Sequence, residues 1–229
     1  MSREEIFGAI RRGLRRGALP EHETLGLYAR LNAHPRHTIP ARSRLPHAEQ
    51  VNLFLRNLEK EFASFTRVPD AAGVPAAIAD YLASQNLPTD LAIAPHDELR
   101  AIDWSLRPLL TLREGRAEAS DLVAVQHGYA AIAETGTLML PASARRPTTL
   151  NLLCDTEIVV LRASRVVGAM EEAWDILRFE REGMVDGNFL PRNVMFVTGP
   201  SRSADIESTL ELGAHGPRRL HVVLIDDAQ

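Results

Sequence analysis

The sequence predicts an α/β fold with three layers, in which helices flank a mainly parallel sheet and an N-terminal helical extension comes first. Six short apolar runs support this prediction, because strands that are apolar throughout are typical of a sheet covered on both faces. Helical patterns lie between several of these runs, as in alternating strand–helix units. The length of 229 residues is sufficient for one large domain of this class.

The expected elements follow from apolar runs and from changes of hydrophobic period. Strands are expected over residues 91–95, 122–126, 137–141, 157–162, 194–199 and 220–225. Apolar residues at helical spacing predict helices over 51–65, 74–85, 167–181 and 203–212, and Gly213 is expected to end the last of them. Together these elements make a predicted α/β domain over residues 51–229.

Residues 1–50 are predicted to form N-terminal helices and an extended arm. Two short helices are expected before residue 32, with a break at 17–21, and residues 32–46 form an exposed arm rich in Pro, Arg and His. The arm is a candidate contact with another subunit. No carboxylate or thiol has ligand spacing to His34, His37 or the nearby His47, so we expect no metal there.

Composition excludes several classes of function. A formal net charge of -4 gives no electrostatic basis for binding nucleic acid or an anionic membrane surface. No apolar run approaches the roughly 20 residues of a membrane span, and the N-terminus does not read as a secretory signal. We therefore expect a cytoplasmic protein.

The single cysteine, Cys154, narrows the possible chemistry further. One thiol cannot build a disulfide, a Cys-rich zinc site or a four-thiolate iron–sulfur cluster within one chain. No base lies near Cys154 in the sequence, so we expect no catalytic thiol. Electron-transfer chemistry would require an exogenous cofactor or a partner chain.

A first candidate site is the stretch AIAETGTLML at residues 131–140, where one carboxylate separates two apolar segments. An ionised Glu134 away from water is costly unless it is paired. The small residues 130–133 allow another backbone or a ligand to come close. Glu134, Thr135 and Gly136 are expected to form a turn, with Thr137 following. Glu134 is then a general base, a nucleophile or a hydroxyl-binding acceptor, or simply a solvated turn residue.

A second candidate site is VTGPSRSADIE at residues 197–207, interpreted as a strand that leads into a helix. Free N–H groups at a helix start attract anions, so phosphate, carboxylate or a dinucleotide is the expected ligand. Asp205 and Glu207 leave an alternative open, since acids in the first turn compete with a bound anion and stabilise the helix themselves. The anion-facing loop comprises Gly199, Pro200, Ser201, Arg202 and Ser203.

Two further segments carry polar groups of interest. The loop GAHGP at 213–217 places His215 between glycines, which permits close approach of a ligand, although a structural role is equally open to a lone loop histidine. Residues 145–149, RRPTT, could hold an anion or form an ordinary charged loop.

Three blocks, AIAETGTLML, TGPSRSADIE and GAHGPRRLHVVL, together resemble the lactate-utilisation protein C family, whose shared unit is the LUD domain. The resemblance covers roughly residue 51 to the C-terminus. It implies a fold like that of the sugar-phosphate isomerases and CoA transferases. It also implies a place in bacterial L-lactate oxidation to pyruvate, alongside two partner proteins that carry iron–sulfur clusters.

The leading hypothesis is an accessory subunit of that oxidation system, with a small anionic ligand bound between the first two blocks and no metal of its own. The alternatives are a stand-alone enzyme acting on a CoA thioester or sugar phosphate, with Glu134 as nucleophile or base, and a non-catalytic module whose arm makes a homo-oligomer contact. The candidate catalytic residues are Glu134, Asp205 and His215, and the candidate ligand-binding residues are Thr135, Gly136, Thr137, Gly199, Pro200, Ser201, Arg202, Ser203 and Gly216.

Overall fold

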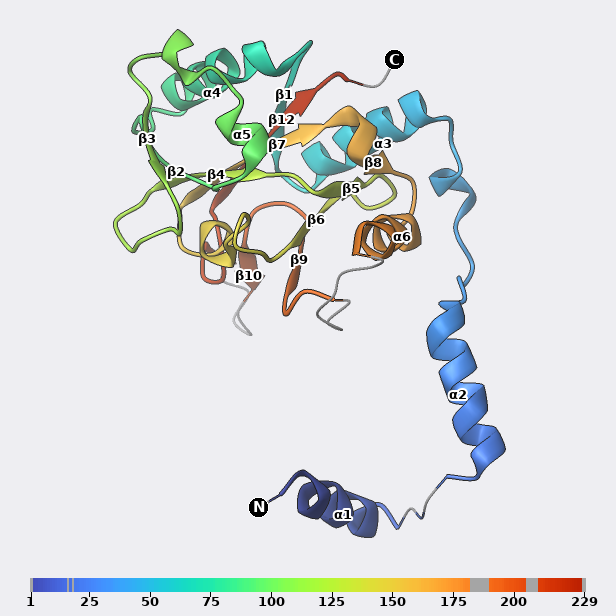
Figure 1. Cartoon of the computed structure of the whole chain (residues 1–229). Coiled ribbons are helices and arrows are strands. Elements are labelled where there is room, and N and C mark those ends of the chain that lie inside the picture. Colours follow the sequence, from blue (N-terminus) through green and yellow to red (C-terminus); the bar gives the residue numbers. More distant parts are fainter. Residues whose placement is uncertain (1, 16, 18, 182–189, 205–209, 228–229) are drawn as a thin grey trace. The chain divides into compact units, whose positions relative to one another are not determined.

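Figure 1 shows the computed structural model, which describes residues 2–15, 17, 19–181, 190–204 and 210–227. The chain divides into two compact units, Met1–Ile39 and Pro40–Gln229. The first unit contains the two predicted N-terminal helices, α1 (Arg3–Gly13) and α2 (Glu21–Ala33). Ser2 and Glu5 form a capping box at the start of α1. Among the described residues, no helix combines the length and the apolar character that a membrane span requires.

The second unit is built on a sheet of six strands, all parallel, in the order β1-β12-β7-β4-β2-β3. The strands are β1 (Ser64–Val68), β2 (Asp90–Ile93), β3 (Thr111–Glu114), β4 (Val123–His127), β7 (Thr156–Arg162) and β12 (Arg219–Ile225). Every residue of β4 and nearly all of β7 and β12 are buried, as expected for a sheet covered on both faces. The predicted parallel α/β architecture is confirmed.

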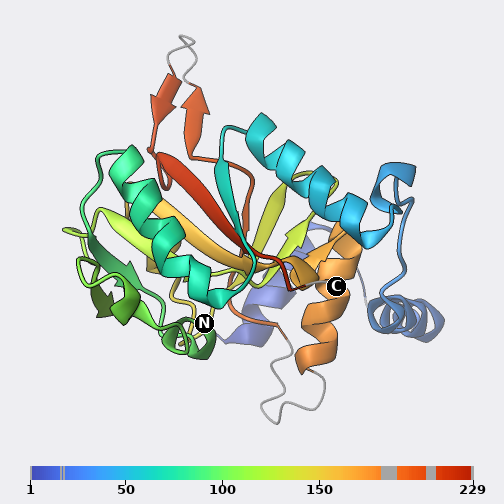
Figure 2. The same cartoon turned by 90° about the horizontal axis from the view of Figure 1, so that it is seen from above.

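Helices α4 (Val74–Ser84) and α5 (Asp97–Arg100) cover one face of this sheet, and helix α3 (His47–Lys60) lies on the other (Figure 2). Side chains of β7 alternate between the two faces. Val160 packs in the core of Ile78 from α4, whereas Val159 packs in the core of Phe54 and Leu58 from α3. Short 3₁₀ turns complete the connections, namely η1 (Ala41–Ser43), η2 (Ala71–Gly73), η3 (Trp104–Leu106), η4 (Thr148–Asn151) and η5 (Ala163–Arg165).

A second sheet of four strands in the order β8-β5-β6-β9 shares the face that α3 covers. Its strands are β5 (Ala130–Ile132), β6 (Thr137–Pro141), β8 (Val166–Val167) and β9 (Val194–Val197). Ala131 and Leu138 face the large sheet, while Ile132 and Met139 face helix α6 (Met170–Arg181). The expected strands 137–141 and 194–199 therefore exist, but they pair antiparallel in this smaller sheet.

Two helix predictions are wrong in part. The helix expected over 51–65 begins at His47 and ends at Lys60, because Phe62 takes a left-handed conformation with φ of 68°. The chain then forms β1, an edge strand whose half-buried side chains lack a continuous apolar run. The sequence analysis missed this strand.

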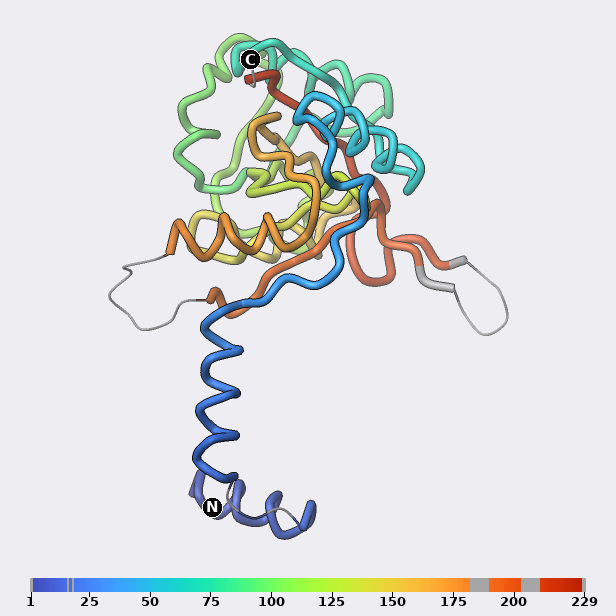
Figure 3. The backbone as a smooth tube through the Cα atoms, turned by 90° about the vertical axis from the view of Figure 1, so that its right-hand side faces the viewer, coloured from blue at the N-terminus to red at the C-terminus, as the bar shows by residue number. Residues whose placement is uncertain are grey.

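The helix expected over 203–212 is absent from the described residues of that segment. Instead β10 (Arg202–Ala204) pairs antiparallel with β11 (Leu210–Leu212), and the two strands lie side by side in Figure 3. The backbone of Ser201 bonds to Gly213 at 2.9 Å and to Pro217 at 2.8 Å, which brings the two arms of the segment together. Ile206, on which the helix prediction also relied, lies outside the described residues.

Candidate functional site

The turn at Glu134 joins β5 to β6, as predicted, and its carboxylate has a partner. Oε2 of Glu134 accepts a hydrogen bond of 2.7 Å from the hydroxyl of Ser43 in η1. The Glu134 backbone N–H donates to the carbonyl of Gly168, and its own carbonyl accepts from the side chain of Asn57. The carboxylate is half-buried and hydrogen-bonded, so the cost of burying it is offset.

Glycines in both predicted motifs allow close approach of α3. Gly136 has φ of +68°, and a Cβ there would lie 2.7 Å from backbone atoms of Asn57 and Leu58. Gly199 has φ of +79°, and its Cβ would lie 2.2 Å from the carbonyl oxygen of Glu61. At both glycines the close neighbour is therefore backbone at the C-terminal end of α3.

Antiparallel pairing brings the first two motifs together through a row of hydroxyl groups. Leu138 pairs with Val197, so Thr137 lies across from Thr198. The hydroxyl of Thr137 is 2.6 Å from that of Thr198 and 2.7 Å from that of Thr135. Thr137 is buried, while Thr135 and Thr198 are exposed. The pairing of β6 with β9 thus brings the two motifs into contact at Thr137 and Thr198.

In the described part of the chain, the remaining predicted site residues make no hydrogen bond or ion pair with Glu134. Ser201 accepts a hydrogen bond from the backbone N–H of the exposed His215, and Gly216 lies against Ser201. Arg202 points elsewhere, with its guanidinium 4.0 Å from the ring centroid of Phe62 and 3.5 Å from the carboxylate of Glu61. Asp205 lies outside the described residues, as do Glu207 and the side chain of Ser203.

The position of the second motif also differs from the prediction. It was expected beyond the carboxyl end of a parallel strand, where ligands bind in open α/β sheets. The backbone of Ser201 bonds to Pro217, and Arg218 bonds to Asp155, so this loop lies at the amino ends of β12 and β7. The rule does not apply here because β9 belongs to the smaller sheet and pairs there antiparallel with β6.

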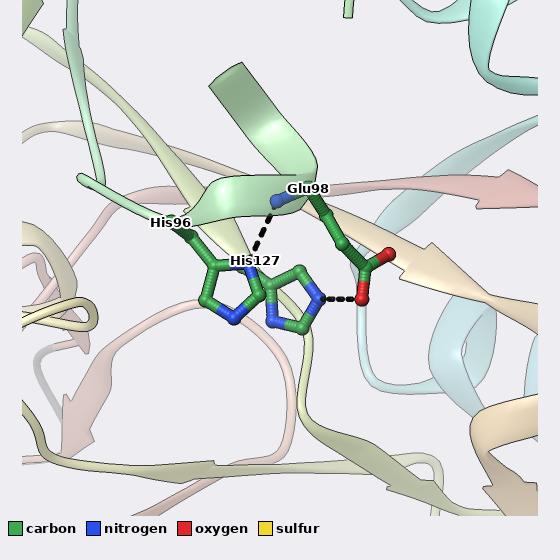
Figure 4. A group of neighbouring side chains, drawn as sticks. All are labelled: His96, Glu98 and His127. Carbon is green, nitrogen blue, oxygen red and sulfur yellow. Dashed lines mark hydrogen bonds and ion pairs between the residues drawn. The ribbon is translucent and has the colours of Figure 1, made fainter. Parts of the chain in front are cut away.

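A cluster of two histidines and a glutamate lies at the carboxyl edge of the large sheet (Figure 4). These residues were not among the candidates predicted from the sequence. His127 ends β4, Arg162 ends β7, and His96 follows β2 just before α5, which contains Glu98. The rings of His96 and His127 stack with centroids 3.6 Å apart. Nε2 of His127 lies 3.3 Å from Oε1 of Glu98, and Arg162 donates to the other carboxylate oxygen.

These contacts determine the protonation states of His127 and Glu98. Burial, together with the positive charges of His96 and Arg146, lowers the pKa of His127 to about 3, although the neighbouring Glu98 acts in the opposite direction. Burial raises the pKa of Glu98, but the Arg162 hydrogen bond and the interactions with His127 outweigh it and hold that pKa below its ordinary value. A neutral His127 beside an ionised Glu98 carries its proton on Nε2, which leaves the Nδ1 lone pair free.

His96, Glu98 and His127 each offer an atom within 4.8 Å of the others, so we tested the cluster as a metal site. Nδ1 of His96 accepts the backbone N–H of Glu98 at 3.3 Å, so neutral His96 carries its proton on Nε2. Both oxygens of Glu98 are occupied by His127 and Arg162. One free lone pair beside the charge of Arg146 suits a proton acceptor better than a divalent cation.

A cavity of about 620 Å³ opens at the same edge, since Pro95 follows β2 and Arg116 follows β3. Arg116 and Arg192 make no ion pair within the described part of the chain. The cavity-lining residues that the structure describes include no carboxylate. Its walls are Pro95, Gly115, Arg116, Ala142, Ser143, Ala144, Pro147, Thr148, Thr149 and Arg192.

Part of the RRPTT loop forms a wall of this cavity, and Arg146 lies in that loop. The guanidinium of Arg146 is 4.9 Å from the ring centroid of Tyr129, and its Nε and Nη1 are buried without a hydrogen-bond partner in the described structure. Arg145 in contrast bonds to Asp97 at 2.6 Å. The sequence signal for this edge was available, because His96 and His127 each stand at the end of an apolar strand.

A buried polar chain lies behind the cavity wall. Asn151 of η4 donates to Oε1 of Glu157 at 2.7 Å and accepts from the side chain of Gln126 at 3.0 Å. Gln126 also donates to the carbonyl of Pro147, which lines the cavity. Burial raises the pKa of the Glu157 carboxyl to about 8, against the weaker opposite effect of Asn151. Glu157 therefore carries a proton near neutral pH.

Comparison with known proteins finds one matching family model and several relatives of similar sequence. The family model described as the LUD domain matches residues 51–225. The chain is 34% identical over 112 residues to lactate utilization protein C of Bacillus licheniformis, covering 49% of this chain and 45% of that protein. It is 36% identical over 96 residues to lactate utilization protein C of Bacillus subtilis, covering 42% of this chain and 39% of that protein. The matches thus span less than half the length of these curated relatives.

A solved structure has the same fold. The crystal structure of a DUF162 family protein from Deinococcus radiodurans superposes with a TM-score of 0.57 at 25% sequence identity. The superposition covers 79% of this chain and 99% of that one.

Proposed function

This chain belongs to the LUD domain family, and we propose on that premise that it serves lactate utilization by binding a small organic acid anion at the carboxyl edge of its six-stranded sheet. The relatives' printed name, lactate utilization protein C, supports the pathway. The carboxyl edge is where open α/β sheets bind ligands. Function is argued from the site, because a shared fold does not determine it.

The observation that carries the proposal is the charge of the cavity. Arg116 and Arg192 line it without an ion-pair partner in the described residues, and Ser143, Thr148 and Thr149 add hydroxyl groups. Arginine binds carboxylates through two parallel N–H donors. Cations and hydroxyl groups along the described wall of the cavity favour an anion over a cation or a neutral molecule.

The redox step of lactate oxidation is assigned in this proposal to partner chains. A single buried cysteine, Cys154, cannot hold a four-thiolate cluster, so iron–sulfur partner proteins would carry the electrons. The subunit proposed here binds and presents the acid. Copurification with iron–sulfur proteins from a cell grown on lactate, and loss of lactate growth without this chain, are the expected results.

Ligand-dependent thermal unfolding tests the binding site directly. L-lactate, pyruvate and propionate are each added to the whole chain, with propane-1,2-diol as the uncharged control. A ligand at 100 times its dissociation constant stabilises the folded state by about 2.7 kcal/mol. Replacing both Arg116→Gln and Arg192→Gln should abolish the stabilisation.

A charge-matched control distinguishes the effect of the cavity arginines from the effect of changing the net charge of the protein. The pair Arg12→Gln and Arg30→Gln removes the same charge from the N-terminal unit and should bind as the unaltered protein does. Equal loss in both double variants, or stabilisation by the diol, would refute the cationic cavity as the site.

The stand-alone enzyme remains an alternative proposal. It requires Glu134 to act as nucleophile or base toward a CoA thioester or sugar phosphate, and the Ser43 hydroxyl currently occupies one of its carboxylate oxygens. Incubation with an acyl-CoA followed by hydroxylamine or borohydride trapping decides it. A hydroxamate or a reduced residue at position 134 would support the enzyme and count against a purely binding role.

A further inference from the structure

Two buried polar groups at the carboxyl edge lack hydrogen-bond partners among the described residues. One is Nδ1 of His127, whose side chain is 8% exposed, and the other is the pair Nε and Nη1 of Arg146. A buried donor or acceptor that stays unpaired costs free energy. Three such atoms in one region therefore point to a ligand that supplies their partners.

The two groups offer opposite hydrogen-bonding capacities. Nε2–H of His127 is directed at Glu98, which Arg162 holds in its ionised form, so Nδ1 presents a lone pair. Arg146 presents N–H donors only. The two side chains are near enough for the charge of Arg146 to lower the pKa of both His127 and His96.

A matching ligand must therefore donate one hydrogen bond and accept at least two beside it. We propose that His127 and Arg146 form a recognition pair for a 2-hydroxy acid, whose hydroxyl donates to Nδ1 and whose carboxylate accepts from the guanidinium. This inference rests on the proposed function and deepens it, because it names the class of acid. Arg116 and Arg192 attract the acid to the cavity, and Arg146, which directly precedes the cavity residues Pro147 and Thr148, then holds its carboxylate beside His127. A 2-oxo acid has no hydroxyl hydrogen and would leave Nδ1 unpaired.

Two neighbouring rings pack against the pair. The His96 ring stacks on the ring of His127, and its Nε2–H adds a donor for a ligand oxygen. Tyr129 lies under the guanidinium of Arg146, and its own hydroxyl donates to Glu180 at 2.8 Å. The Nδ1 atom is closed to solvent, so binding involves a shift of the half-buried His96 or Arg146 side chain.

Titration calorimetry of the whole chain with L-lactate, propionate and pyruvate at pH 7 tests the pair. Lactate should bind at least tenfold more tightly than propionate or pyruvate, a difference of about 1.4 kcal/mol. His127→Gln keeps a donor toward Glu98 but removes the Nδ1 acceptor, so lactate should fall to the affinity of propionate. Arg146→Gln should weaken all three acids by a similar factor.

His221 supplies the matched control. It is also a buried histidine with a lowered pKa, yet it lies in β12, where Ser64 and Thr66 occupy both ring nitrogens. His221→Gln should leave the preference for lactate unchanged. Three acids of equal affinity, or a preference that survives His127→Gln, would show that water satisfies Nδ1 and overturn the recognition pair alone. No binding of any acid would instead refute the proposed function.

Discussion

The hydroxyl of Ser43 donates a 2.7 Å hydrogen bond to the carboxylate of Glu134, joining two residues that are 91 positions apart in the chain. The same segment lies against Gly168, where a Cβ would be 1.8 Å from the carbonyl oxygen of Ser43. Ser43 is buried, although it belongs to the end of the arm that the sequence predicted to be exposed. Glu134 therefore fastens the end of the arm to the α/β unit.

Removing this contact should release the arm. Glu134→Ala leaves the buried Ser43 hydroxyl without its charged acceptor, which is expected to lower the free energy of unfolding by about 1–3 kcal/mol. Trypsin cleavage at Arg42 and Arg44 in the native protein should become faster. Thr135→Ala is the control, because the hydroxyl of Thr135 bonds to Thr137, not to Ser43. Unchanged cleavage in Glu134→Ala would contradict the fastening role.

The close packing of α3 on the β5–β6 turn predicts a severe effect of Gly136→Ala. The new Cβ would meet the backbone of Asn57 and Leu58 at 2.7 Å, in addition to the strain of a φ of +68°. Gly115→Ala is the comparison, because its φ of +140° is at least as strained for an L residue, but nothing lies within 4 Å of its Cβ. Urea unfolding should show Gly136→Ala to be the less stable variant by at least about 2 kcal/mol. Equal losses of stability in the two variants would mean that the contact of the new Cβ with α3 adds nothing to the backbone strain.

Glu157 should make stability depend on pH. Its folded pKa of about 8 lies above the ordinary value of 4.5, so between these pH values the unfolded chain releases a proton that the folded chain keeps. The free energy of unfolding that depends on Glu157 is therefore at its highest below pH 4.5. It falls as the pH rises toward 8, by up to about 1.4 kcal/mol per pH unit. Urea unfolding of Glu157→Gln from pH 5 to 8 should show a shallower decline. The exposed Glu59→Gln should keep the original slope, and a parallel decline in both variants would exclude Glu157 as the cause.

Cys154 should be inert in the native protein. Burial, followed by the negative charges of Asp121 and Glu157, raises the pKa of its thiol to about 12. At pH 8 the thiolate, which is the reactive form, is scarce. Ellman's reagent should react slowly with the folded chain and release one equivalent in urea, whereas a Ser120→Cys variant with an exposed second thiol should react at once. Rapid native reaction at Cys154 would disprove the burial argument.

The four inner strands of the large sheet were readable from the sequence because burial on both faces requires continuous apolar runs, as in β4 and β7. The edge strands β1 and β3 were not predicted, because both are only partly covered and polar side chains such as Ser64 and Arg67 interrupt the pattern. The β10–β11 pairing was misinterpreted as a helix because Ile206 and Leu210 have a spacing that suits both. The local sequence does not reveal the backbone hydrogen bond between Ser201 and Gly213, which brings the two strands together.

The sequence by itself determined the fold class and the membership of the chain in its family, since both depend on apolar runs and motifs that are local in the chain. It also determined that Glu134 stands at a turn. Only the tertiary structure decided what the turn contacts, because Ser43 and α3 reach it from distant segments. The structure likewise assembled His96, Glu98, His127 and Arg162 at one edge, because parallel pairing aligns the carboxyl ends of strands that lie tens of residues apart.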